Sequence, residues 1–239
     1  MALNLPYSNE EFLRIVKLAE GVSNRNLLDN GYFADPINQR GQTEYTATGY
    51  TIDRWRLVYL EDGYGLTVND GYVTLSAGST VRETRLDQFL ENSSACYGKT
   101  ATVSVMLPDG KVYTATRTIP VPNGTDYVTT NYVVKDNFSC LVQAQPTGQL
   151  VFRIIAKLGH SVDIAAVKLE LGEHSTMEND APPSKAEELA KCQRFFQRYR
   201  TQSLRPTYAD DCRPVMRAEP TVGTITANGM TYYTLSADL

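Results

Sequence analysis

Short stretches in which apolar and polar residues alternate, separated by turns rich in Gly, Asn, Asp and Pro, run through most of this chain. A period of two places successive side chains on opposite faces of a β-strand. These stretches occupy residues 51–60, 66–68, 72–76, 99–107, 112–119, 127–134, 138–144, 150–157 and 161–171. About eight or nine strands with short connections, and no helical pattern between them, favour an antiparallel β-sandwich over a parallel α/β sheet.

Trp55 is the single tryptophan of the sequence. It shares one face of its predicted strand with Leu57 and Tyr59, while Arg54 and Arg56 occupy the opposite face. An aromatic residue flanked in register by other apolar side chains is typical of a sandwich interior. The alternative is an exposed ring that stacks against a sugar. We expect Trp55 to be a core residue.

A strand, a polar loop and a capped helix follow one another between residues 161 and 200. Pro182 and Pro183 disfavour helix, so Ser184 can act as the N-cap, and Glu187 three residues later completes a capping box. The helix is therefore expected to start near Lys185. Its apolar stripe, which needs either the sandwich or a neighbouring copy of the chain as a partner, is Leu189, Cys192, Phe196 and Tyr199.

The first residues also predict an amphipathic helix, from about residue 10 to residue 21, capped by Ser8 or Asn9. Its apolar stripe is Phe12, Ile15, Ala19 and Val22. A helix of about 12 to 15 residues is marginal alone. It therefore packs either on its own domain or on other copies as a short parallel coiled coil that sets the oligomer number.

The end of the chain reads as a β-hairpin. Residues 221–226 and 230–235 flank the turn Ala227, Asn228 and Gly229. An isolated two-stranded hairpin is marginal in water. We expect this one to add to the main sheet or to pack against a neighbouring subunit.

The composition is that of an ordinary globular protein, with 42% hydrophobic residues, 21% charged residues and a formal net charge of -4. An acidic chain gives no reason to expect contacts with nucleic-acid phosphates, and no apolar stretch approaches the roughly 20 residues of a membrane span. The first 22 residues lack the basic start and apolar centre of a secretion signal. We expect a soluble protein made without a Sec-type signal, with neither nucleic acid nor membrane insertion among its interactions.

The sequence does not contain the motifs of serine hydrolases, zinc proteases or phosphate-binding loops, namely G-x-S-x-G, H-E-x-x-H and G-x-x-x-x-G-K-[ST]. Its neighbouring carboxylates are Glu61 with Asp62, Asp210 with Asp211, and Glu170 with Glu173. Closeness in sequence does not define the separation of several ångströms that glycoside hydrolysis requires. We predict that the protein is not an enzyme and that these carboxylates are solvated surface groups.

No cofactor is predicted. The two histidines have no spaced partner, and the four cysteines, which we expect to be free thiols, form no C-x-x-C pair. The cysteines are Cys96, Cys140, Cys192 and Cys212. Asp62, Asp70 and Asp109 each precede Gly, which turn formation explains, and a calcium site of loop carboxylates and carbonyls is the alternative.

The chain holds 15 tyrosines, many of them in or beside predicted loops. An aromatic ring with a polar edge suits the stacking and hydrogen bonding that hold a sugar. β-Domains also use tyrosine freely in strands and at half-buried edges. The candidate carbohydrate contacts are Tyr64, Tyr72 and Tyr113.

Four segments carry a resemblance to a known family. They are NLLDNGYFADPINQRG at 26–41, YTIDRW at 50–55, AAVKLELG at 165–172 and EELAKCQRFFQRY at 187–199. In this order they resemble the carbohydrate-binding-module-like domains of bacteriophage tail fibres and appendages, often found in prophages of Gram-positive gut bacteria. The ordered set is fairly specific for the family, though not for any ligand.

The resemblance implies a mostly-β protein with a jelly-roll antiparallel sandwich at residues 26–175. A short oligomerisation helix at 1–25 precedes the sandwich, and a loop, one amphipathic helix and a β-hairpin at 176–239 follow it. It also implies a homotrimer in a phage tail or appendage, assembled in the bacterial cytoplasm and located in the virion. The predicted oligomerisation contacts are Phe12, Ile15, Ala19, Val22, Leu189, Phe196 and Tyr199.

Our leading hypothesis is a non-enzymatic phage tail fibre or appendage domain that binds host-surface carbohydrate and so serves host attachment, with avidity multiplying weak sites. The alternative is a purely structural virion component, such as a head or collar decoration or a fibre adaptor, which contacts other virion proteins and binds no glycan. A depolymerase is disfavoured because no acid pair is recognisable.

Overall fold

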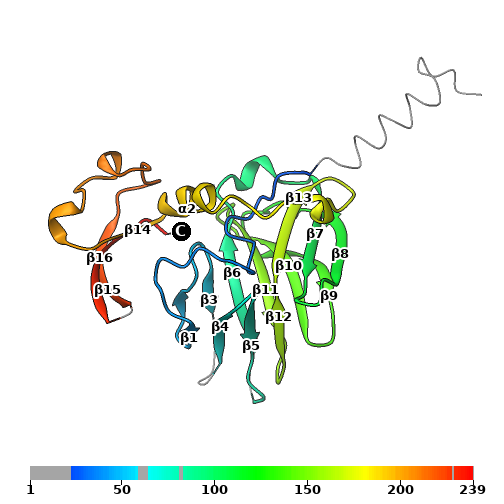
Figure 1. Ribbon diagram of the computed structural model, residues 1–239. Helices are drawn as coiled ribbons and strands as arrows, with labels where there is room; N and C mark the ends of the chain where they lie inside the picture. The colour runs from blue at the N-terminus through cyan, green and yellow to red at the C-terminus, as the bar shows by residue number, and fades with distance from the viewer. Residues whose placement is uncertain (1–22, 59–63, 81–82, 228, 239) are drawn as a thin grey trace, which may run out of the picture.

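The computed structural model describes residues 23–58, 64–80, 83–227 and 229–238. Figure 1 shows a large β-sandwich body and a smaller C-terminal unit, joined across the top by the helix α2 (Lys185–Gln193). The predicted N-terminal helix, with Phe12, Ile15, Ala19 and Val22, lies outside the described residues. Within the described residues, no helix is long and apolar enough to cross a membrane.

One layer of the body is a six-stranded antiparallel sheet in the order β2-β3-β6-β11-β10-β9. Its strands are β2 (Gly49–Tyr50), β3 (Arg56–Val58), β6 (Thr84–Phe89), β9 (Val128–Val134), β10 (Phe138–Ala144) and β11 (Leu150–Ala156). A short 3-10 helix, Ser93–Ala95, follows β6. The strands predicted at 127–134, 138–144 and 150–157 are confirmed to within one residue at each end.

The second layer consists of two smaller antiparallel sheets, in the orders β1-β4-β5-β12 and β13-β7-β8. Their strands are β1 (Glu44–Tyr45), β4 (Gly65–Asn69), β5 (Tyr72–Ser76), β7 (Thr100–Met106), β8 (Val112–Thr118), β12 (Ser161–Ile164) and β13 (Ala166–Leu171). Inward side chains of all three sheets belong to one buried cluster. The prediction of an antiparallel β-sandwich is confirmed.

The single strand predicted at 161–171 is wrong, because the chain breaks at Ala165. Before the break β12 pairs with β5, and after it β13 pairs with β7. The Ala165 N–H donates to the Met106 carbonyl at 2.8 Å, and its carbonyl accepts from the Ala34 N–H at 2.8 Å. These long-range hydrogen bonds let one continuous alternating stretch serve two neighbouring sheets.

The strand predicted at 51–60 is shorter than expected, because residues 51–55 turn between β2 and β3. The Thr51 N–H donates to the Trp55 carbonyl at 2.8 Å, and Arg54 at the tip has a φ of 72°. Trp55 is nevertheless fully buried, edge-to-face with Phe33 at 5.1 Å and with Phe152 at 6.1 Å between ring centroids. The core assignment of Trp55 is confirmed, and its burial excludes the sugar-platform alternative.

Helix α2 begins where the capping pattern predicts, with the Ser184 hydroxyl accepting from the Glu187 N–H at 3.5 Å. It ends earlier than predicted, at Gln193, and the predicted stripe residues Phe196 and Tyr199 lie in the strand β14 (Phe196–Tyr199) instead. Beyond Gln193 the helical period gives way to tertiary contacts: Phe195 and Phe196 pack against arginines of the body, and β14 pairs with the C-terminal strand 230–236.

The C-terminal hairpin is confirmed as β15 (Thr221–Ala227) and β16 (Met230–Ser236). It does not add to the main sheet. β16 pairs with β14, and the unit is a separate three-stranded sheet in the order β14-β16-β15. The loops around it include the short 3-10 helices Gln202–Leu204 and Ala209–Asp211, and another, Met177–Asn179, precedes α2.

Candidate ligand-binding cleft

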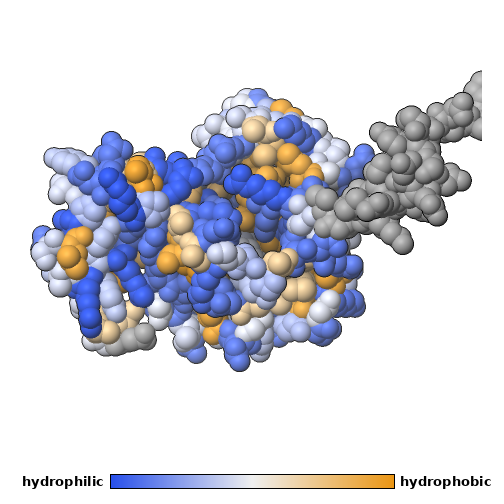
Figure 2. Space-filling view, turned by 45° about the horizontal axis from the view of Figure 1, so that its top comes forward, coloured by the Kyte–Doolittle hydropathy of each residue, from blue (hydrophilic) through white to orange (hydrophobic). Residues whose placement is uncertain are grey.

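A cleft of about 640 Å³ opens on the face of the body next to α2. Its walls are the segment 23–32, the outer surface of β13 with Met106, the loop 177–183, and the side chains of Glu188 and Lys191 on α2. Figure 2 shows this face hollowed near its middle, with hydrophilic residues around the hollow. The volume lies in the range of sites that hold small ligands.

The segment 23–32 is held along β13 by backbone and side-chain hydrogen bonds. The Leu27 N–H donates to the Leu169 carbonyl at 2.8 Å, and the Val167 N–H donates to the Gly31 carbonyl at 2.8 Å. The Asn26 side-chain amide accepts from the Leu169 N–H at 3.0 Å and donates to the Val167 carbonyl at 3.0 Å. The segments NLLDNG and AAVKLELG, far apart in sequence, therefore form one continuous wall.

Gly31 is required by the closeness of this wall to β13. A Cβ at this position would lie 2.5 Å from the Val167 carbonyl oxygen. Backbone atoms cannot move aside as the end of a flexible side chain can, so a larger residue here would push the segment off the strand.

The outer face of β13 carries a buried charged cluster. The Lys168 ammonium donates to the Ser23 hydroxyl at 3.0 Å, the Thr176 hydroxyl at 2.9 Å and the Asp180 carboxylate at 2.7 Å. Glu170, also fully buried, accepts from the Thr176 N–H at 2.8 Å and lies 3.7 Å from the Lys168 ammonium. Because its protons are donated to these acceptors, Lys168 ties three segments together rather than acting as a free amine.

The prediction that Glu170 is a solvated surface carboxylate is wrong, because Glu170 is fully buried, and the role of Lys168 was not predicted. The alternation predicts an exposed polar face for β13, but Thr176 and Asp180 in the loop after Gly172 contact that face, and both side chains are buried. The available signal was the pairing of Lys and Glu on one strand face with Thr176 and Asp180 in the loop that follows. Opposite charges close to one another in the sequence indicate side chains that can be buried together, because each charge then has an ion-pair or hydrogen-bond partner.

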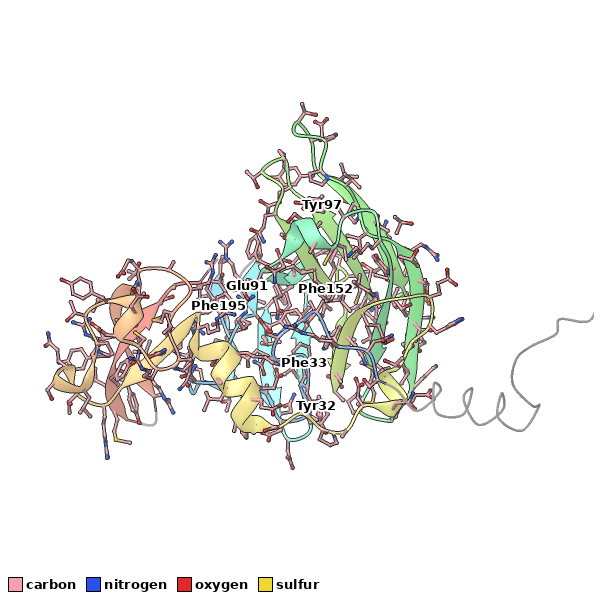
Figure 3. All side chains as sticks on the ribbon, turned by 90° about the horizontal axis from the view of Figure 1, so that it is seen from above. Tyr32, Phe33, Glu91, Tyr97, Phe152 and Phe195 are labelled. Carbon is pink, nitrogen blue, oxygen red and sulfur yellow. The ribbon has the colours of Figure 1, made fainter. Side chains whose placement is uncertain are left out.

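The rest of the lining combines apolar surface with a charged rim. Met106, Met177 and Pro182 contribute apolar surface, and Tyr32 adds a half-buried aromatic ring. A second hollow of about 70 Å³ adjoins the cleft and shares Tyr32 with it. Figure 3 shows Tyr32 beside the loop that leads into α2.

Charges on the rim come from several segments. Glu188 and Lys191 form an ion pair on α2, and the Glu188 carboxylate also accepts from the Asn30 N–H at 2.8 Å. Arg25 and Glu178 are exposed at the mouth. Of the described residues that line the cleft, none is His or Cys, so the arrangement offers hydrogen bonds and apolar contact but no histidine- or cysteine-based nucleophile.

The three tyrosines predicted to contact carbohydrate lie apart from one another and do not line the cleft. Tyr64 precedes β4 and Tyr72 begins β5 at the other end of the same hairpin, so roughly 14 to 17 Å of strand separates them. Tyr113 lies on β8, where its ring packs against Phe138 and has the Lys135 ammonium 4.1 Å from its centroid. All three side chains are half-buried.

Two of the three predicted oligomerisation residues near α2, Phe196 and Tyr199, have partners inside the chain. Phe196 is buried, with the Arg40 guanidinium 4.0 Å from its ring centroid. Tyr199 packs on the small buried cluster of the C-terminal unit, and Leu189 is half-buried on α2. The stripe therefore does not form one continuous surface.

A buried electrostatic centre joins the body to the C-terminal unit. The Arg40 guanidinium contacts the Asp53 carboxylate at 3.2 Å and the Asp238 carboxylate at 2.8 Å. Burial raises the pKa of Asp53 to about 7, against the opposing effects of the Arg40 charge and of hydrogen bonds from Gln39. Burial also raises the pKa of Asp238. These residues connect two β-structures and line no cleft described above.

Other arginine contacts surround this joint. The Arg54 guanidinium lies 3.4 Å from the Phe195 ring centroid and donates to the Asp29 carboxylate at 3.0 Å. Arg194 pairs with Glu91 at 2.7 Å, and Figure 3 shows Glu91 and Phe195 where the two units meet. The EELAKCQRFFQRY segment thus attaches the C-terminal unit to its own body.

The structure also shows the surroundings of the cysteines and of some of the carboxylates considered above. The four cysteines are free and buried. Asp109 accepts from the Lys111 N–H at 3.0 Å, as a turn-forming aspartate does. Among the residues that the structure describes, no group of three or more His, Cys, Asp and Glu side chains could hold a metal ion. Glu61 and Asp62 lie outside the described residues.

Comparison of the chain with protein-family models, with curated proteins and with solved structures finds no significant match.

Proposed function

We propose that this protein is a non-enzymatic, carbohydrate-binding part of a phage tail fibre or related appendage, and that the cleft beside β13 is its saccharide site. The observation that carries the proposal is the combination, in one cleft, of the Tyr32 ring, an apolar methionine and proline surface, and a rim of charged side chains. The ordered resemblance of four sequence segments to such appendage domains supports it.

The chemistry of the cleft matches that of a sugar. The C–H face of a pyranose packs against an aromatic ring, while its hydroxyls exchange hydrogen bonds with charged and amide side chains at its edges. Glu188, Lys191 and Arg25, which all line the cleft, provide such groups. The hydrogen-bonded Lys168 cluster holds the walls in place before a ligand arrives, so little ordering is needed on binding.

Display of several copies on one particle raises the overall strength of attachment. Linked sites increase avidity by about 10² to 10⁴ over a single site. The homotrimer that the resemblance implies stays a prediction, and the N-terminal stripe expected to take part in it lies outside the described part of the chain.

A glycan array of bacterial surface polysaccharides, probed with the intact protein, tests the function. We expect binding that Tyr32→Ala weakens roughly tenfold, the equivalent of about 1.4 kcal/mol. Tyr32→Phe, which keeps the ring, retains most of the binding. Tyr72→Ala is the matched control, because Tyr72 does not line the cleft. A blank array together with no adsorption to any host cell would refute the function, and loss of binding in the Tyr72 variant alone would move the site to the β4–β5 hairpin.

A second candidate function is a purely structural virion component that binds no glycan. Exposed apolar side chains on the C-terminal unit favour it, with 67% of Leu204, 63% of Tyr208 and 53% of Val222 accessible. Particles assembled without the protein distinguish the two. Complete particles that fail to adsorb to cells support carbohydrate binding, whereas incomplete particles support the structural role.

A further inference from the structure

Among the strands that the structure describes, none pairs with the outer edge of β15 in the C-terminal sheet. Five of its seven residues are exposed, namely Thr221, Val222, Gly223, Thr224 and Thr226. The opposite edge of the same sheet is covered, because the Phe196 carbonyl of β14 accepts from the Gln39 side chain of the body at 2.9 Å. The body therefore covers the edge of β14, whereas β15 is exposed along most of its length and meets the body at its last residue, Ala227, which is buried beside Gly41.

β15 also lacks the features that protect a free edge. Its sequence, TVGTITA, contains no charged residue and no proline. Soluble proteins usually block such a strand with Lys, Pro, a bulge or a covering element. In the body, the uncharged outer strand β9 has the other layer beside it, where the Tyr132 hydroxyl donates to the Arg117 carbonyl at 3.4 Å. An uncovered, uncharged strand of this length is a template for another strand.

The hydrogen-bonding pattern of the sheet determines which backbone N–H and C=O groups of β15 face away from β16. The Ala237 N–H donates to the Phe195 carbonyl. The backbone N–H and C=O groups of every second residue of β16, counted back from Ala237, therefore face β14. The backbone groups of the intervening residues, such as Thr234 and Tyr232, face β15, where these residues pair with Gly223 and Ile225. The N–H and C=O groups that remain for the free edge are those of Val222, Thr224 and Thr226.

We propose that this edge binds a second copy of the chain, with β15 pairing antiparallel to its own counterpart about a two-fold axis at Thr224. In this register Thr224 faces the partner's Thr224, and Val222 faces the partner's Thr226. Every outward N–H and C=O of the three residues then has a partner, which a register centred on Val222 or Thr226 does not achieve.

A second copy fits this edge because a two-fold rotation places the outward N–H and C=O groups of Val222, Thr224 and Thr226 opposite the same groups of the partner. No charged side chain of β15 meets a like charge in the partner, and β-branched Val and Thr face each other across the join, which suits cross-strand packing. The exposed side chain of Val222 becomes covered. The contact unites two C-terminal sheets into one and leaves the clefts of both copies unobstructed at β13.

Cysteine cross-linking of the full chain tests the register. Directly opposite Cα atoms of a hydrogen-bonded antiparallel pair lie about 5.5 Å apart, within the range of a disulfide. Thr224→Cys is expected to form a covalent dimer on mild oxidation with diamide. Thr221→Cys is the matched control, because its two copies would be about 20 Å apart in this register. The four native cysteines are buried, so the unmodified protein should not cross-link.

Charge repulsion tests the contact without relying on a new thiol. Thr224→Lys places two ammonium groups face to face across the axis, and light scattering should show the particle mass of the unmodified protein fall by half. Equal cross-linking of both cysteine variants would overturn the proposal, and so would an unchanged particle mass in Thr224→Lys. Either result would mean that the β15 edge is free or binds a different protein. Glycan affinity per site should not change in Thr224→Lys, so this result is independent of the proposed carbohydrate function.

Discussion

The sandwich body and the C-terminal unit are both antiparallel β-structure, but different forces stabilise them. The body buries one large apolar cluster that includes the Trp55, Phe33 and Phe152 rings. The buried cluster of the C-terminal unit consists of Ala209, Cys212, Met216, Leu235 and Ala237. Most of these side chains are small, so the unit gains little hydrophobic free energy of its own.

The C-terminal unit is stabilised instead by what the body supplies. Arg40 bridges Asp53 of the body and Asp238 of the unit while its guanidinium covers the Phe196 ring. Arg54 covers Phe195 in the same way. A charge is tolerated inside a protein only when its partners are present, so these contacts are strong while complete and costly when broken. We therefore expect the body to fold without the unit, and the unit to need the body.

The largest expected effect comes from the body core. Trp55→Ala removes the centre of the aromatic cluster and leaves the Asn30 carbonyl without its 2.9 Å donor, so the free energy of unfolding should fall by about 3 to 5 kcal/mol. Both units should lose structure together, as measured by circular dichroism during urea unfolding. Tyr127→Ala, at a body residue that is 63% exposed, is the control and should change stability by less than about 0.5 kcal/mol. Survival of the C-terminal sheet in the Trp55 variant would contradict the dependence.

A smaller and more local effect should follow from the joint. Arg40→Met leaves Asp53 and Asp238 buried without their cation, at a cost of about 3 kcal/mol to docking of the unit. Limited proteolysis should cleave residues 195–238 first and leave a folded body. Arg117→Met, which removes an exposed arginine that donates to the neighbouring Thr116 carbonyl at 2.7 Å, is the control and should leave the proteolysis pattern unchanged. Simultaneous unfolding of both parts would show that the joint also stabilises the body.

The most gradual effect, spread over several pH units, is a pH dependence that the joint should contribute. The pKa of Asp53 rises from its ordinary 3.8 to about 7, so between these values the folded protein holds a proton that the unfolded chain has released. The free energy of unfolding therefore falls as pH rises through this window, by on the order of 1 kcal/mol per pH unit. Asp53→Asn should flatten this slope, leaving the contribution of Asp238, whose pKa is raised as well.

Denaturant titrations between about pH 4 and pH 7 measure this slope. Asp35→Asn serves as the comparison, since the Asp35–Lys185 pair is exposed and should contribute little. An equal slope in the Asp53 variant and in the unmodified protein would mean that Asp53 is ionised throughout the window and that Arg40 fully compensates its burial.

Local signals in the sequence predicted local structure well. Ser184 before Glu187 correctly marked the first turn of α2, and the Ala227 to Gly229 turn marked the C-terminal hairpin. Trp55 was correctly assigned to the core, although a turn rather than a regular strand presents it. For the helix cap and the hairpin turn, the physical determinant lies within a few residues along the chain, whereas Trp55 is buried against the distant Phe33 and Phe152.

Features that depend on distant segments were not predictable. The alternation across Ala165 does not reveal that Met106 and Ala34 break it into two strands. The spacing of Phe196 and Tyr199 suits a helix equally well, until Arg40 and the β16 strand are brought beside them. The candidate cleft needs four separate segments, and the predicted tyrosines could not indicate it because they lie elsewhere.

The sequence by itself determined that this chain is an antiparallel β-sandwich followed by a capped helix and a hairpin, because period, caps and turns are set by neighbouring residues. Only the tertiary structure decided which polar residues are buried, as Lys168, Glu170 and Asp53 show. Burial of a charge depends on whether a distant segment returns with matching partners, and no local pattern carries that information.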